Sequence, residues 1–145
     1  MQGFRFPLQK LLDIRVDKEE QSKRKLMEAQ RQQNITQAKL DELKANYARY
    51  NVLDNNLTVA EKKMKVNYLN TLANGILKTK DELEQKKAVV NSCREDVRLR
   101  QIERKTVEII KDKRLEAFKK EQDRKEQVQI DEFALYAFMR NLERG

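Results

Sequence analysis

The sequence predicts an all-α protein, an antiparallel two-helix coiled-coil hairpin with a longer second helix. Apolar residues make up 39% of its 145 residues and charged residues another 39%, a balance typical of coiled coils and long helices. Three glycines and one proline leave little turn chemistry, which indicates few and long elements. Apolar residues recur at alternating intervals of four and three, the repeat that winds two helices around each other.

The first helix is expected over about residues 7–54. Its apolar stripe begins at Leu8 and keeps the 3.5-residue repeat as far as Leu57. The second helix is expected over about residues 59–142, with a stripe that starts at Leu69. Polar residues interrupt the two stripes, and should weaken the pairing locally, at Arg15, Glu19, Arg100 and Arg104.

A turn is predicted at residues 54–60, because the two stripes are out of phase across this stretch. Asparagine and aspartate at 54–56 disfavour a helix interior, since their side chains compete for backbone groups. Thr58 and Glu61 then have the spacing of a capping box that opens the next helix. A rival break lies at Asn74 and Gly75, where glycine could end a helix and leave two equal arms.

The predicted helices are unequal, so the second one should extend beyond the first. Leu8 would lie opposite the region of Thr106, which leaves roughly 50 Å of the second helix without an internal partner. Another molecule is expected to cover this overhang, unless it is shorter than predicted or self-associates. Its large apolar residues include Phe118, Val128, Phe133, Leu135, Phe138, Met139 and Leu142.

Charge does not single out one class of partner. The net charge is +8, but acidic and basic residues alternate along the chain, as on solvated helix faces. The densest basic cluster, residues 62–65, is interpreted as a solvated flank of the turn, because no aromatic stacking platform accompanies it. A generic homodimeric coiled coil remains an alternative, and a basic nucleic-acid binder is a weaker one.

The chemistry of an enzyme is missing from the sequence. There is no histidine, no phosphate-binding glycine loop and no metal-ligand spacing, and a two-helix hairpin offers no closed pocket for a carboxylate pair. Cys93 lies on the apolar stripe, where a thiol acts as a small apolar side chain. The first twenty residues show neither a secretory signal nor an anchor. We therefore expect one cytosolic, non-enzymatic domain over residues 1–145, without cofactor or metal.

The two ends of the chain resemble the FliJ family, the soluble component of the bacterial flagellar type III export apparatus. The opening segment, Phe4 to Arg15 followed by Glu19 and Glu20, is similar to the aromatic, double-leucine, arginine and acidic start of that family. The stretch from Arg124 to Ala134 resembles its closing pattern. Together with the chain length and the broken repeat, these segments identify a member of the family over the whole chain.

The resemblance implies an adaptor that inserts into the hexameric export ATPase ring and contacts the cytoplasmic domain of the membrane export gate. It also implies binding of empty export chaperones, a peripheral location at the cytoplasmic face of the flagellar basal body, and only an indirect link to the membrane. The expected ring contacts are Leu8, Leu11, Leu12, Arg15, Phe133, Phe138 and Met139. The expected gate contacts, which are also natural core positions, are Leu40, Leu43, Tyr47, Tyr50, Leu69, Leu72 and Ile76.

Overall fold

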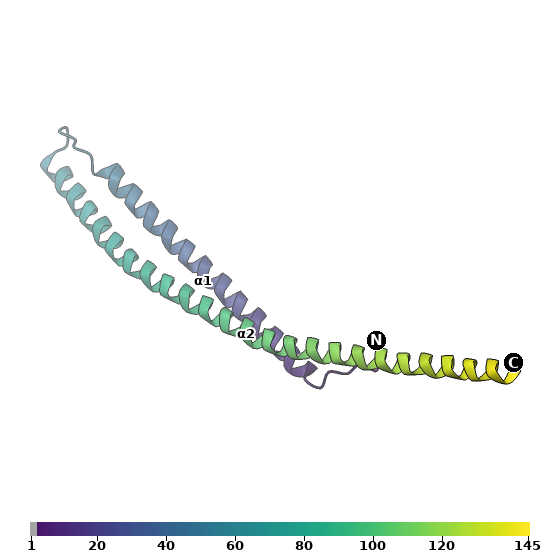
Figure 1. Ribbon diagram of the computed structural model, residues 1–145. Helices are drawn as coiled ribbons and strands as arrows, with labels where there is room; N and C mark the ends of the chain where they lie inside the picture. The colour runs from purple at the N-terminus through teal and green to yellow at the C-terminus, as the bar shows by residue number, and fades with distance from the viewer. Residues whose placement is uncertain (1–2) are drawn as a thin grey trace. The chain divides into compact units, whose positions relative to one another are not determined.

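The computed structural model describes residues 3–145 and contains two α-helices in this range, α1 (Gln9–Tyr50) and α2 (Val59–Arg144) (Figure 1). The helices pack against each other as a hairpin, with 42 residues in α1 and 86 in α2. The predicted all-α hairpin with a longer second helix is therefore confirmed. The first helix ends before residue 54, because the asparagine-rich stretch already leaves the helix at residue 51.

The connection between the helices is held by local hydrogen bonds of two kinds. The Asp54 side chain accepts a hydrogen bond from the backbone N–H of Asn56 at 3.0 Å, which closes a turn. Thr58 Oγ1 then accepts a bond from the Glu61 backbone N–H, and Glu61 Oε2 accepts one from the Thr58 N–H, both at 3.2 Å. These reciprocal bonds form the capping box that the sequence predicts, and they explain why α2 begins at residue 59.

The rival break at Asn74 and Gly75 does not occur, because α2 is continuous through both residues. A Cβ atom added to Gly75 would stand 3.7 Å from a methyl carbon of Leu43 on α1. Gly75 therefore lies on the packed side of α2, in ordinary van der Waals contact range of the opposite helix. The glycine serves neither as a helix terminus nor at a positive φ angle.

The contacts divide the chain into two compact units. One unit is Asp17–Gln101, and the other joins the described residues up to Val16 with Ile102–Gly145. In the first unit the helices run antiparallel, since Ser22 near its start bonds Asp96 near its end at 2.6 Å, while Tyr50 meets Tyr68 beside the connection. The prediction of a single domain over residues 1–145 stays a prediction.

The core of the unit Asp17–Gln101 consists of one layer of side chains between the helices. Several of its buried positions carry small or hydroxylated residues, among them Ser22, Ala29, Thr36 and Thr79. The Thr36 hydroxyl donates to the carbonyl of Gln32 one turn earlier at 3.0 Å, so its burial leaves no unsatisfied donor. The larger buried apolar residues are Leu40, Leu72, Leu83, Val90 and Val97.

In the other unit the segment before α1 extends the packing. Phe6 is buried with Leu12 and Val107, and Phe4 packs against Phe118 with the rings tilted by 55° and their centroids 5.4 Å apart. Phe118 is consequently half-buried, which corrects its placement among the uncovered residues of the second helix. The reason is that the chain before α1 continues along α2 beyond the start of α1. Every residue from 119 onward is exposed.

Candidate interaction surfaces

A group of exposed large apolar residues lies on the final turns of α2. Phe133 is 75% exposed, Phe138 60% and Met139 54%, so all three of these predicted ring contacts are free of internal packing. Arg140 places its guanidinium 5.1 Å from the ring centre of Tyr136, a contact within the helix itself. Other large apolar residues exposed in this stretch are Val128, Ile130, Leu135, Tyr136 and Leu142.

The predicted ring contacts of the first helix differ in accessibility. Leu11 is exposed and Leu8 is half-buried, whereas Leu12 is buried in the cluster with Phe6 and Val107. A partner could reach Leu12 only by opening this cluster. Leu11 and the edge of Leu8 are therefore the accessible members of this group.

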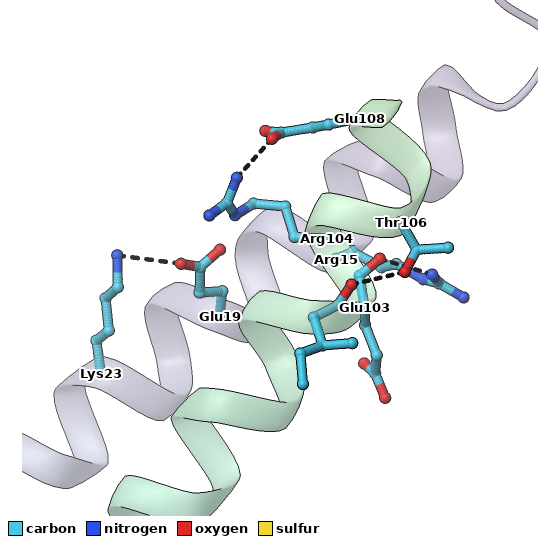
Figure 2. Close-up of polar contacts among 8 residues, drawn as sticks. Arg15, Glu19, Lys23, Glu103, Arg104, Thr106 and Glu108 are labelled. Atoms are coloured by element: carbon cyan, nitrogen blue, oxygen red, sulfur yellow. Dashed lines mark hydrogen bonds and ion pairs between the residues drawn. The ribbon is translucent and has the colours of Figure 1, made fainter. Parts of the chain in front are cut away.

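Arg15 belongs to the same predicted group but is already engaged. Its Nη1 donates to the backbone carbonyl of Glu103 at 2.7 Å, where Thr106 also donates to the carbonyl of Ile102 one turn earlier (Figure 2). Arg15, which interrupts the apolar stripe of α1, thus forms a hydrogen bond to α2. Arg104 pairs with Glu108 on its own helix at 2.7 Å.

Glu19, in the other unit, is buried to 3% exposure although it carries a carboxylate. Lys23, one turn later on α1, approaches it at 3.2 Å (Figure 2). Ser22 lies beside it on the helix and donates a hydrogen bond to Asp96 at 2.6 Å. Arg100 stands 3.7 Å from Asp96, so the interrupted part of the stripe is a bonded polar layer.

The predicted gate contacts are spread from the core to the surface. Leu40 and Leu72 are buried and serve as core residues. Tyr50 is 46% exposed, and its ring meets Tyr68 edge-on with centroids 5.1 Å apart. The remaining members, each half-buried, are Leu43, Tyr47, Leu69 and Ile76.

Two aromatic features were not assigned a role from the repeat. Tyr68 extends the exposed aromatic surface at Tyr50, but it lies one residue before the stripe that begins at Leu69. Phe6 lies under two cations, with Lys111 and Arg114 at 6.0 and 5.9 Å from its ring centre. The only sign of this Phe6 contact in the sequence was the pair Phe4 and Phe6, which directly precedes the apolar repeat that begins at Leu8.

Exposed ion pairs cover much of the remaining helix surface. Glu28 accepts hydrogen bonds from Arg31 and from Gln32, and these bonds lower the pKa of the Glu28 carboxyl to about 2. Two similar pairs, Glu95 with Arg98 and Glu121 with Arg124, also have a lowered carboxyl pKa. Each pair joins two residues three apart within the same helix and lies in solvent, so these pairs contribute little to stability.

Within residues 3–145 neither helix has an apolar stretch long enough to cross a bilayer. The same residues include no cluster of acidic or cysteine side chains that could hold a metal ion.

The profile of the flagellar FliJ protein family matches residues 4–143, which is nearly the whole chain. The chain belongs to the FliJ family. It is therefore a coiled-coil component of the flagellar export apparatus, and the family is non-enzymatic. Comparisons with curated proteins and with solved structures returned no match.

Proposed function

We propose that this FliJ protein is an adaptor that inserts the exposed end of α2 into the hexameric export ATPase ring and reaches the export gate with the end near its turn. The observation that carries the proposal is the exposed apolar group on the final turns of α2. An isolated helix in water gains nothing from so many large apolar side chains, so a partner must cover them.

The distribution of these side chains around α2 favours a partner that encloses the helix. At 3.6 residues per turn, Phe133 and Phe138 point about 140° apart. Leu135, Met139 and Leu142 share one face with Phe138 through spacings of three and four residues, whereas Phe133 lies on the opposite face. A second copy in a two-stranded coiled coil would bury only one narrow stripe, whereas the centre of a ring contacts a helix from several sides.

The gate contact is assigned to the exposed aromatic surface of Tyr50 and Tyr68, together with the accessible edges of Tyr47, Leu69 and Ile76. Tyrosine suits a contact that is partly wet, and it is enriched at protein interfaces. Leu40 and Leu72 contribute indirectly, by holding the two helices together. Export chaperones would bind the same adaptor, which therefore works at the cytoplasmic face of the basal body.

The test is stimulation of the purified export ATPase by the full-length protein. Phe133→Ala with Phe138→Ala should reduce the stimulation at least about tenfold, because each lost aromatic removes about 1.5 to 3 kcal/mol of burial at the partner. The melting temperature should stay unchanged. Gln122→Ala, an exposed polar position about three turns before Phe133, should leave both quantities unchanged.

Two results would overturn this assignment. The first is a lowered melting temperature with unchanged stimulation, which would place the aromatics in an internal core. The second is a dimeric mass by light scattering that becomes monomeric in the double variant, which would assign the surface to a second copy of the chain.

A further inference from the structure

A second exposed apolar surface lies at the connection between the helices, far along the chain from the ATPase-binding residues. We define the tip as residues 51–66. Leu53 is 98% exposed, more than any other large apolar residue among those described, and the next most exposed here is Val59 at 76%. Met64 is 72% exposed and Val52 60%. None of the described helices covers these side chains.

Lysines share this surface with the apolar residues. Val59, Lys62, Lys63 and Val66 follow each other at the helical spacings of three and four, so they share one face of the first turns of α2. The same face borders the connection, because Lys62 and Val66 line a shallow hollow of about 360 Å³ together with residues of the loop.

The lysines at this surface differ in how free they are. The ammonium group of Lys65 donates a hydrogen bond to the backbone carbonyl of Val52. Lys65 is partly buried, and this bond holds the loop against α2. Lys62 and Lys63 are exposed. The two acidic residues of the tip, Asp54 and Glu61, are both engaged in the hydrogen bonds that shape the turn and the cap. These bonds come from neutral backbone N–H groups and leave both carboxylates charged, so three lysines against two acidic residues give the tip a net charge of +1.

We propose that the tip is a docking surface for anionic phospholipid. Exposed aliphatic side chains beside lysines match the chemistry of a membrane surface, where the apolar groups enter the headgroup boundary and the ammonium groups meet the lipid phosphates. Three asparagines, at 51, 55 and 56, keep the backbone of the loop at the polar level of the bilayer. The contact is therefore shallow and reversible.

An acidic protein partner fits the tip less well. Protein interfaces are enriched in arginine and aromatic residues and depleted in lysine. Residues 51–66 contain three lysines and neither arginine nor any aromatic residue. The tip borders the surface proposed for the gate, since Leu69 lines the same hollow, but the two sets share no residue and can be separated by mutation.

The first experiment is co-sedimentation of the full-length protein with phosphatidylcholine vesicles, with and without phosphatidylglycerol. We expect binding only with phosphatidylglycerol, and a decrease in binding as salt is raised. Lys62→Gln with Lys63→Gln should weaken binding about tenfold or more. The matched pair Lys119→Gln with Lys120→Gln removes the same charge from exposed lysines elsewhere on α2, and it should change binding by less than about twofold.

The second experiment uses the absence of tryptophan from the chain. Leu53→Trp introduces a single reporter at the tip, and its emission should shift to shorter wavelength when anionic vesicles are added. Leu77→Trp, at a residue that is 63% exposed outside the tip, should show no shift. Absence of binding to anionic vesicles, equal loss in the two lysine pairs, or equal shifts at both tryptophans would overturn the proposal. Each outcome leaves the ATPase test unaffected.

Discussion

Two stretches of α2 carry similar apolar repeats but have different environments. From Leu69 to Phe118 the stripe is covered, and Leu83, Val90 and Val107 are 5%, 1% and 2% exposed. From residue 119 to Arg144 every residue is exposed, although large apolar side chains continue at helical spacing. Periodicity therefore predicts that a helix has an apolar side to bury, but it does not say which molecule supplies the cover.

The two stretches of α2 should differ most in how readily they unfold locally. An isolated helix is marginal in water, whereas packing between helices stabilises every turn that takes part. We expect amide hydrogens of residues 121–142 to exchange orders of magnitude faster than those around Val90. Hydrogen exchange followed by mass spectrometry measures this directly, and added export ATPase should slow exchange in the first set.

Equal protection in both stretches would contradict this comparison. Protection that rises with protein concentration would show that the exposed end of α2 associates with itself.

Truncation of a buried leucine should distinguish the two stretches at the level of stability. Leu40 is 3% exposed, so Leu40→Ala should lower the free energy of unfolding by about 2 to 5 kcal/mol through lost burial and a new cavity. Leu135 is 60% exposed, and Leu135→Ala should change the free energy of unfolding by less than about 0.5 kcal/mol. Urea unfolding followed by circular dichroism gives both values. A similar loss in the two variants would mean that Leu135 has an internal partner.

The sequence predicted what depends on neighbours along the chain. The capping box at Thr58 could be recognised because its hydrogen bonds join residues three apart in the sequence. The two helices could be recognised because their apolar repeat is a local pattern. The contact of Phe4 with Phe118 could not be predicted, since it depends on the path of the chain before α1. Burial of Leu12 agrees with its position four residues after Leu8 on the predicted stripe, whereas the cover that Phe6 adds depends on the path of the chain before α1.

The cap at the start of α2 should contribute a smaller amount. Thr58→Ala removes the acceptor for the Glu61 backbone N–H, which costs about 1 kcal/mol for a typical cap. Thr58→Ser keeps the hydroxyl acceptor and should cost only a few tenths of that amount. Thermal unfolding of the three proteins gives the order, and equal melting temperatures for Ala and Ser would show that the hydroxyl contributes nothing.

The smallest effect has the opposite sign and tests the continuity of α2. Glycine in a helix interior is less stable than alanine by about 0.5 to 1 kcal/mol, because it loses more backbone freedom on folding. The added methyl of Gly75→Ala would meet Leu43 at 3.7 Å, an ordinary contact, so this variant should be more stable by about that amount. Gly75→Leu places a larger group against the same residue and should lose the gain through overpacking. Denaturant titration of both variants decides the matter, since a destabilising alanine would mean that the chain bends at residue 75 as the rival hairpin requires.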